Sequence, residues 1–195
     1  MEKFELRIVG TGGNGIILTG LILASASMNH DELYVAQTQA YSPESRGGYC
    51  KSELQLSKKE ILFPKVTVPN LFATLSETTI SQDMKGFTSD TLVIADDGFN
   101  IENFAQNSKY KTILQFPFFS FTQANFRSTL YTNMVFMGVL SHYLPWISSE
   151  SILHSIREKV KNKNLETNLK AFIAGTTLNP SRILDNCLDS TKEKA

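Results

Sequence analysis

The spacing of apolar positions changes from that of a strand to that of a helix within the first thirty residues. Residues 6–9 form a short apolar run of β-prone side chains. After four glycines between residues 10 and 15, apolar side chains recur at helical spacing from Ile17 to Ala26. This pattern predicts a strand, a glycine turn and a helix over residues 5–29.

The remaining apolar pattern predicts that strands and helices alternate. Strands are expected over residues 33–39, 49–56, 71–75, 91–95 and 112–116. The strand at 49–56 alternates, with Lys51, Glu53 and Gln55 on one side. Helices are expected over residues 77–84, 131–144, 148–161 and 165–175, the last capped by Gly175. We therefore expect an α/β fold with a Rossmann-like, mostly parallel sheet flanked by helices, a mixed or antiparallel element at 49–56 and a helical C-terminal portion.

The composition is that of an ordinary globular chain, with 42% hydrophobic and 19% charged residues. A chain of 195 residues can bury a sizeable core, and we expect one domain over residues 1–180 followed by a polar C-terminal tail over residues 181–195. Basic and acidic residues both number 19, so the formal net charge is zero, which argues against a general nucleic-acid binder. The chain starts without a signal-like segment and has no apolar run long enough to cross a bilayer, so we expect a cytoplasmic protein with no membrane partner.

The cysteines and histidines argue against a metal centre in this chain. Cys50 and Cys187 lie far apart, whereas an iron–sulfur cluster normally needs four cysteine ligands. No C-x-x-C motif exists for zinc or for thiol redox chemistry. Of the three histidines, His142 and His154 fall on predicted helices and are expected at the surface or at an interface. No pair of nucleophile and base suggests a catalytic centre.

The glycine turn matches G-x-G-x-x-G in the strand-to-helix context that a phosphate-binding turn requires. Glycine adopts positive φ freely, and the start of the following helix directs unpaired N–H groups at the turn. A dinucleotide site also needs an acidic residue at the end of the second strand, whereas Asp31 and Glu32 precede that strand, so NAD and FAD are disfavoured. The alternative is a tight crossover without a ligand. The candidate residues are Gly10, Gly12, Gly13, Asn14 and Gly15.

A second candidate site is the loop AYSPESRGGYC over residues 40–50, in which a proline and a glycine pair exclude regular structure. Its Arg46 lies between Ser45 and the pair Gly47 and Gly48. A guanidinium beside flexible backbone N–H groups suits a phosphate or a carboxylate. The alternatives are an arginine that holds the loop through its carbonyls, or one that binds a partner chain.

Acidic and aromatic clusters follow two of the predicted strands. Asp96 and Asp97 follow the strand at 91–95. Acidic residues there can face a ligand crevice, but we favour a simple turn. A group of phenylalanines follows the strand at 112–116, and we expect it in the core or at a partner interface rather than as a base-stacking platform. These residues are Phe118, Phe119 and Phe121.

Several segments in this order resemble one family over residues 4–175. They are GTGGNG, QTQAYSPESRGG, KSELQLS, ILFPKVTVPN, TLVIADD, NMVFMG and NLKAFIAG. The series resembles the gamma subunit, or gamma domain, of the 2-oxoacid:ferredoxin (acceptor) oxidoreductases, which act on pyruvate, 2-oxoglutarate, 2-oxoisovalerate or indolepyruvate. Two positions depart from the family pattern: Asn14 stands where the family usually has glutamine, and Asn70 where it usually has aspartate.

The resemblance implies a subunit without a cofactor of its own. In such enzymes thiamine diphosphate with its magnesium ion lies between the alpha and beta chains, and iron–sulfur clusters lie in the beta chain or in a ferredoxin-like delta chain. The gamma domain packs beside them, near the coenzyme A site in related single-chain enzymes. The implied partners are therefore the alpha, beta and delta chains and, through the complex, ferredoxin or another acceptor. The glycine turn and the loop with Arg46 are then expected to contact coenzyme A phosphates or the alpha chain.

The function that follows is that of a gamma subunit supporting coenzyme A-dependent oxidative decarboxylation of a 2-oxoacid to an acyl-CoA. The chain resembles most the stand-alone gamma chains of 2-oxoglutarate enzymes, with pyruvate as the alternative substrate. Two other hypotheses are a free-standing nucleotide- or phosphate-binding protein that uses the glycine turn, and a purely structural scaffold. A homodimer of the isolated chain also stays open.

Overall fold

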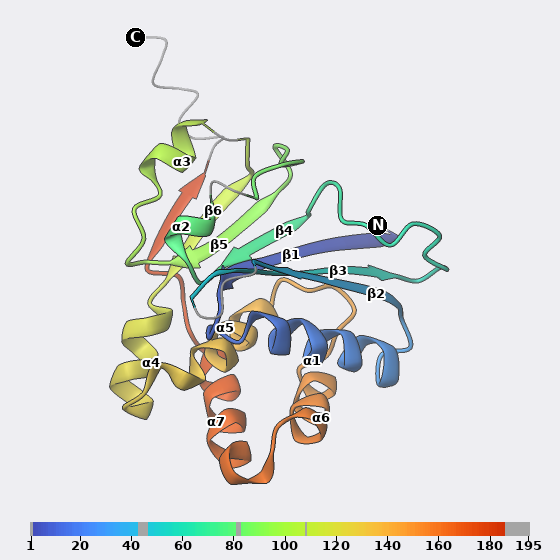
Figure 1. Cartoon of the computed structure of the whole chain (residues 1–195), viewed down its shortest axis with the longest axis vertical. Helices are drawn as coiled ribbons and strands as arrows, with labels where there is room; N and C mark the ends of the chain where they lie inside the picture. The colour runs from blue at the N-terminus through green and yellow to red at the C-terminus, as the bar shows by residue number, and fades with distance from the viewer. Residues whose placement is uncertain (1, 43–46, 81–82, 108, 186–195) are drawn as a thin grey trace.

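A seven-stranded mixed sheet lies at the centre of the computed structural model, over residues 2–42, 47–80, 83–107 and 109–185, which the structure describes. The strand order is β2-β3-β1-β4-β5-β6-β7, and Figure 1 shows the sheet above a layer of helices. The strands are β1 (Lys3–Thr11), β2 (Tyr34–Tyr41), β3 (Tyr49–Ser57), β4 (Leu71–Thr74), β5 (Leu92–Asp96), β6 (Thr112–Phe116) and β7 (Arg182–Asp185).

The middle of the sheet is parallel and its two sides are antiparallel. Strands β1, β4, β5 and β6 pair in parallel, so their carboxyl ends meet at one edge of the sheet. Strand β3 runs antiparallel to β1 and to β2, and its first residue, Tyr49, pairs with Thr11 at the end of β1. This pairing brings the β2–β3 connection to the carboxyl end of β1. The predicted α/β fold, with its antiparallel element at residues 49–56, is confirmed.

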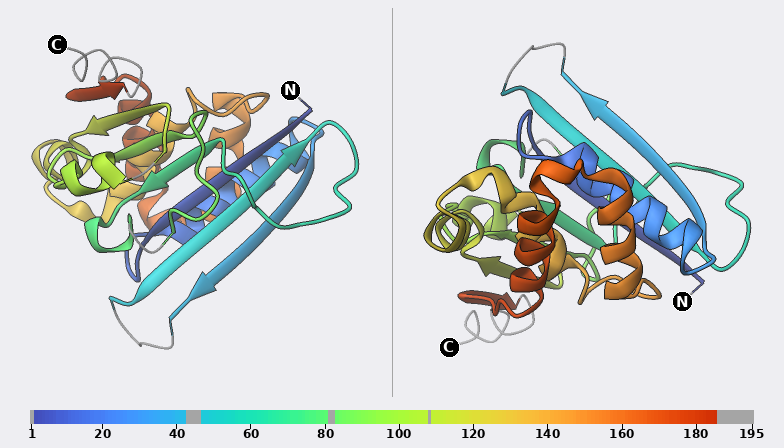
Figure 2. Two further views of the ribbon diagram at one scale, coloured as in Figure 1. Left: turned by 90° about the horizontal axis from the view of Figure 1, so that it is seen from above. Right: turned by 90° about the horizontal axis from the view of Figure 1, so that it is seen from below.

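The longer helices cover one face of the sheet, and two short helices lie on the other (Figure 1). The first face carries α1 (Ile16–Asn29), α4 (Phe118–Phe126), α5 (Thr132–Leu140), α6 (Ser149–Lys159) and α7 (Leu165–Thr176), with 3-10 turns at Thr129–Tyr131 and Asn162–Asn164. The other face carries α2 (Glu77–Ile80) and α3 (Glu102–Asn107). Seen from below in Figure 2, α1 lies along the side of the sheet that β1, β2 and β3 form. None of the helices that the described residues form is long and apolar enough to span a membrane.

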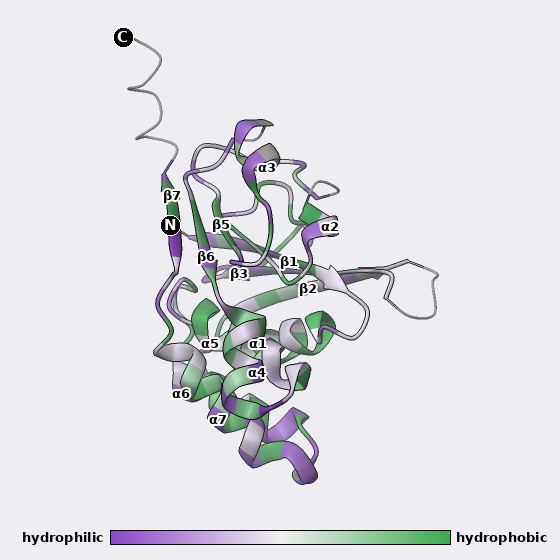
Figure 3. Ribbon diagram, turned by 90° about the vertical axis from the view of Figure 1, so that its left-hand side faces the viewer, coloured by the Kyte–Doolittle hydropathy of each residue, from purple (hydrophilic) through white to green (hydrophobic). Residues whose placement is uncertain are grey.

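Alternation along β1 separates two apolar cores. Leu6 and Ile8 point toward the helical layer and pack with Leu23 of α1 in the larger core. Val9 points the other way and packs with Phe72 of β4 in a smaller core under α2 and α3. Helix α5 is buried along its whole length and is largely hydrophobic (Figure 3), because it lies inside the helical layer.

Helices α5 and α7 cross with their backbones in contact at two glycines. A Cβ atom added at Gly138 would lie 2.2 Å from the carbonyl oxygen of Phe172, and one added at Gly175 would lie 2.1 Å from the carbonyl oxygen of Val135. The expectation that Gly175 caps a helix is wrong, because it lies inside α7 and the C-cap is Thr177. Its role is close helix packing, which only contact between distant segments can reveal.

Other expectations about the elements also need correction. The helix predicted over residues 77–84 is too long, because α2 ends at Ile80 and Asp83 instead binds side chains of β1 and β3. Residues 182–185, assigned to the polar tail, extend the sheet as β7 by pairing antiparallel with β6. His142 lies in the turn after α5 rather than on a helix, although it is exposed as expected. Helices α3 and α4 were not predicted, since both are short segments without clear helical spacing.

Candidate functional site

The glycine turn joins the end of β1 to the start of α1, as the sequence predicts. Gly15 is the N-cap of α1 and has φ 71°, and Gly13 has φ 101°. An added Cβ at Gly15 would lie 2.6 Å from Nδ2 of Asn133, and one at Gly10 would lie 2.8 Å from the side chain of Ile16. At Gly13 an added Cβ would meet nothing within 4 Å. Packing therefore explains Gly10 and Gly15, whereas Gly13 faces open space where a ligand or a partner can approach.

The side-chain amide of Asn14 forms hydrogen bonds within the turn. Its Oδ1 accepts hydrogen bonds from the backbone N–H of Thr11 at 2.8 Å and from the Thr11 hydroxyl at 2.6 Å. The backbone N–H of Asn14 donates to the carbonyl of Thr11 at 3.0 Å. The Asn14 oxygen is thus occupied by the turn itself, and the shorter arm found in this chain is long enough for that task.

The β2–β3 hairpin reaches the glycine turn directly. The backbone N–H of Gly12 donates to the carbonyl of Gly48 at 2.8 Å. Gly47 has φ 70°, a backbone conformation that residues other than glycine rarely adopt. The structure therefore brings together the two glycine motifs that the sequence singled out. Ser45 and Arg46 lie outside the described residues, so their predicted role stays a prediction.

A hollow of about 390 Å³ opens beside the glycine turn. Its lining brings Gly13 and Gly15 together with Lys159 and Lys161, which come from the end of α6 and the residues after it. Ammonium groups and the N–H groups at the start of a helix both attract anions. The sequence placed these lysines only at the end of a helix, because their proximity to the turn depends on α6 packing against α1.

Asp96 forms a turn, which confirms the favoured interpretation. The residue is 5% exposed, and its carboxylate accepts hydrogen bonds from the N–H of Gly98 at 2.9 Å and of Phe119 at 3.0 Å. Burial raises the pKa of Asp96, although these N–H groups act against that shift. The expected place of the phenylalanine cluster is confirmed in part, since Phe118 is buried and packs against Phe136.

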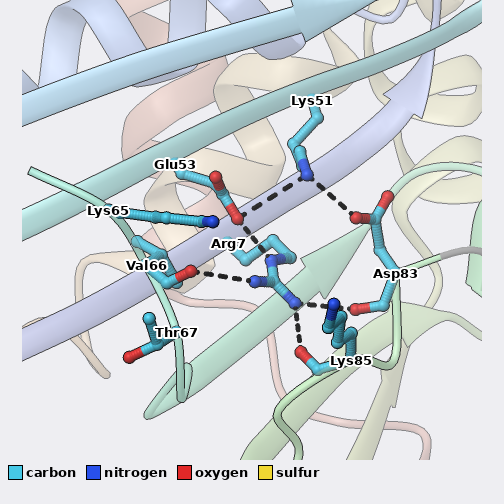
Figure 4. A pocket seen from close by; sticks show the side chains of 8 residues that line it. All are labelled: Arg7, Lys51, Glu53, Lys65, Val66, Thr67, Asp83 and Lys85. Atoms are coloured by element: carbon cyan, nitrogen blue, oxygen red, sulfur yellow. Dashed lines mark hydrogen bonds and ion pairs between the residues drawn. The ribbon is translucent and has the colours of Figure 1, made fainter.

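A second hollow, of about 300 Å³, lies on the opposite face of the sheet over β1 and β3 (Figure 4). Its floor is the buried Arg7, whose Nε bonds Glu53 at 2.6 Å. The Arg7 Nη1 atom donates to the carbonyls of Asp83 at 2.8 Å and Lys85 at 2.7 Å, and Nη2 donates to the carbonyl of Val66 at 3.3 Å. The arginine thereby joins two strands to two connecting loops.

Lys51 and Tyr49 complete this charged network. The Lys51 ammonium lies 3.1 Å from the Asp83 carboxylate and 3.7 Å from that of Glu53. The Tyr49 hydroxyl donates to Asp83, and burial together with this bond raises the pKa of Tyr49. The predicted common face of Lys51, Glu53 and Gln55 is confirmed, since their side chains all engage groups on this side of the sheet.

Glu5 is a buried anchor next to Arg7. Its Oε2 accepts hydrogen bonds from the backbone N–H groups of Thr67 and Val68, both at 2.9 Å. Burial raises the pKa of Glu5, but the bonds from Lys3, Val68 and Thr67 outweigh it and hold that pKa below its usual value. The backbone N–H of Glu5 donates to Oδ1 of Asn70 at 2.8 Å, so the asparagine supplies the oxygen acceptor that an aspartate would.

The described residues offer little redox or nucleophilic chemistry. Within the part of the chain that the structure describes, no three His, Cys, Asp or Glu side chains are grouped so that they could hold a metal ion. The Cys50 thiol is buried, and burial raises its pKa, which keeps it in the unreactive protonated form. Beside the glycine turn, the arrangement presents lysine ammonium groups and a helix N-terminus, which attract anions.

The fold and the glycine turn define an α/β protein whose strand-to-helix crossover is suited to anions. The chain belongs to the pyruvate ferredoxin/flavodoxin oxidoreductase family, whose pattern matches residues 5–178. The resemblance stated from the sequence is therefore confirmed.

The similar proteins agree with this assignment. The 2-oxoglutarate synthase subunit KorC of Methanothermobacter marburgensis is 32% identical over 177 residues, which are 89% of this chain and 95% of that protein. The gamma subunit of a keto/oxoacid ferredoxin oxidoreductase from Geobacter sulfurreducens has the same fold, with a TM-score of 0.77 and 23% identity over 91% of this chain and 96% of that one. The 2-oxoglutarate:ferredoxin oxidoreductase from Magnetococcus marinus matches with a TM-score of 0.79 and 24% identity, over 91% of this chain but only 31% of the longer one.

Proposed function

We propose that this chain is the gamma subunit of a cytoplasmic, multi-subunit 2-oxoglutarate:ferredoxin (acceptor) oxidoreductase. The observation that carries the proposal is the match to the KorC subunit of a 2-oxoglutarate synthase over 95% of that subunit's length. Because this chain matches almost the whole of that subunit, we infer that it has the same place in a complex of the same type. Its partners are then alpha, beta and ferredoxin-like delta chains, and pyruvate is the alternative substrate.

The chemistry of bond cleavage and electron transfer belongs to the other chains in this proposal. Thiamine diphosphate with magnesium supplies the carbanion chemistry of decarboxylation, and iron–sulfur clusters carry the electrons. Coenzyme A accepts the acyl group as a thioester. The Magnetococcus marinus enzyme, whose structure holds 2-oxoglutarate, coenzyme A and succinyl-CoA, contains a region with the fold of this chain.

We infer that the hollow beside the glycine turn binds the phosphates of coenzyme A, which its positively charged lining supports. The N–H of Gly12 is already bonded to Gly48 and the Asn14 oxygen to Thr11, so neither is available to a ligand. The other groups there that attract an anion are the N–H groups at the start of α1, apart from that of Ile17, which bonds Cys50, and the ammonium groups of Lys159 and Lys161. In this proposal they bind and orient the nucleotide end of coenzyme A, and they move no proton.

The test is a comparison of assembled complexes that carry variants of this chain. Lys159→Ala with Lys161→Ala should raise the KM for coenzyme A about tenfold, because two exposed ion pairs contribute about 1 kcal/mol or less each. The kcat at saturating coenzyme A should not change. Lys170→Ala is the matched control, since Lys170 is an exposed helical lysine paired with Glu166.

The outcomes separate the hypotheses. An unchanged KM in an intact complex removes the coenzyme A role from this hollow and leaves contact with a partner chain. Oxidation of 2-oxoglutarate, but not of pyruvate, by the wild-type complex supports the proposed substrate. Tight binding of NAD, FAD or ATP by the isolated chain in calorimetry would instead favour a free-standing nucleotide-binding protein.

A further inference from the structure

The connection from β3 to β4 carries two consecutive large apolar residues whose side chains are exposed. Leu62 is 87% exposed and Phe63 is 65% exposed, and Val68 further along the loop is 46% exposed. Leucine and phenylalanine are among the residues that folding normally buries. Apolar side chains clustered on a surface mark places where another molecule binds. The sequence predicted only an extended connection at residues 61–70.

Residues 65–68 of this loop, which follow Leu62 and Phe63 and include Val68, are held by side chains of β1 and β3. The Gln55 amide donates to the carbonyl of Lys65 at 2.6 Å, and Arg7 donates to that of Val66. Glu5 accepts from the N–H groups of the next two residues, and the Val66 side chain is itself buried. Every residue from 65 to 68 therefore bonds a side chain of β1 or β3. A segment that is fixed before contact loses little conformational entropy when a partner binds, and this holds for Val68 and for the backbone that follows Phe63.

The buried charged residues of β1, Glu5 and Arg7, hold this loop in place. Arg7 pairs with Glu53 and Glu5 pairs with Lys3. Burying charged groups costs free energy that such pairing does not always return, and apolar residues in such places are often equally stable. Apolar residues at positions 5 and 7 would leave the carbonyl of Val66 and the N–H groups of Thr67 and Val68 without these partners. Glu5 and Arg7 thus each support a particular shape of the loop.

The hollow over β1 and β3, which residues 65–67 of this loop line, has an excess of positive charge. Four cations and two carboxylates line the adjacent hollow, and Arg7 and Lys51 pair with those carboxylates. Lys65 and Lys85 are exposed and have no acidic partner within ion-pair distance among the described residues. In the view of Figure 4 they lie on either side of Arg7. An acidic surface would complement this excess, whereas a second copy of the chain would bring the same two lysines.

We propose that Leu62, Phe63 and Val68 form a docking knob that inserts into an apolar groove on another chain of the oxidoreductase complex. Carboxylates at the edge of that groove pair with Lys65 and Lys85. Apolar contacts at the centre and charges at the rim are the usual organisation of a protein interface. The proposal rests on the proposed function, because it takes its partner from the same complex.

Assembly of the co-expressed complex tests the knob. Leu62→Ser with Phe63→Ser should weaken co-purification with the other subunits about tenfold or more, because apolar residues at an interface centre commonly contribute that much. Lys65→Glu with Lys85→Glu should weaken co-purification as well, whereas Lys65→Arg with Lys85→Arg, which keeps the charge, should not. Ile173→Ser removes an equally apolar, exposed side chain from α7 and is the control. Thermal unfolding of each isolated variant shows whether it folds.

A cross-linking experiment identifies the partner. With a photoreactive benzoylphenylalanine in place of Phe63, irradiation of the complex should join this chain to another subunit. A wild-type chain that does not assemble with those subunits overturns the proposed function, and this proposal with it. If the wild-type chain assembles and the double serine variant assembles equally well, the docking knob alone is overturned. The same conclusion follows if the cross-link joins only two copies of this chain.

Discussion

The substitution Gly175→Ala distinguishes local helix propensity from tertiary packing by the sign of its effect. Inside an exposed helix, glycine to alanine raises stability by about 1 kcal/mol. Here the added Cβ would lie 2.1 Å from the carbonyl oxygen of Val135 in α5. An ordinary contact begins at 3.4 Å, so the two backbones have to separate by about 1 Å.

The magnitude follows from what that separation disturbs. The neighbouring Phe172 and Val135 are fully buried, so the movement loosens contacts at the centre of the helical layer. Overpacking of this kind costs about 1–3 kcal/mol, and the contact with backbone rather than with a flexible side chain favours the upper end. After the gain in propensity, the free energy of unfolding should fall by about 2 kcal/mol. For a chain of this size, that lowers the Tm by about 4–8 °C.

Thermal unfolding of the isolated chain, followed by circular dichroism, measures this effect. Gly138→Ala meets the carbonyl oxygen of Phe172 at 2.2 Å in the same crossing and should behave alike. The double variant should lose less than the sum of the two, because helices already separated by one Cβ have room for the second. A Tm that rises or does not change in Gly175→Ala refutes the close contact between α5 and α7.

Three further predictions concern the polar anchors. Arg7→Met should lower the free energy of unfolding by about 3–5 kcal/mol in urea titrations, because it leaves three carbonyls without a donor and the Glu53 carboxylate with only the more distant Lys51, and adding Glu53→Gln should recover part of that loss. The pKa of Glu5 is lower in the folded chain than its usual 4.5, so its carboxylate stabilises the fold above that pH, and the difference between wild type and Glu5→Gln should shrink on acidification. Asn14→Ala should cost about 1–2 kcal/mol in thermal unfolding, whereas Asn14→Asp, which keeps the acceptor, should cost less.

The candidate site was predictable where it depends on short segments. The glycines and their strand-to-helix context are visible in residues 5–29, because turn conformation is a local property. The meeting of that turn with Lys159 and Lys161 was not visible, since it arises from packing between α1 and α6, more than a hundred residues apart. The rigid loop at residues 65–68 was equally hidden, because its anchors come from strands far away in the chain.

By itself, the sequence determined the strands and helices with strong apolar periodicity, the α/β class, the family and the glycine turn. The elements, the class and the turn follow from local propensity and from the period at which side chains face one side of an element, whereas the family follows from the resemblance of several segments in order. Only the tertiary structure decided that Gly175 packs a helix crossing, that residues 182–185 form an edge strand and that Arg7 holds two loops. The physical reason is that hydrogen bonds and close contacts between distant segments depend on which faces meet, and no local pattern contains that information.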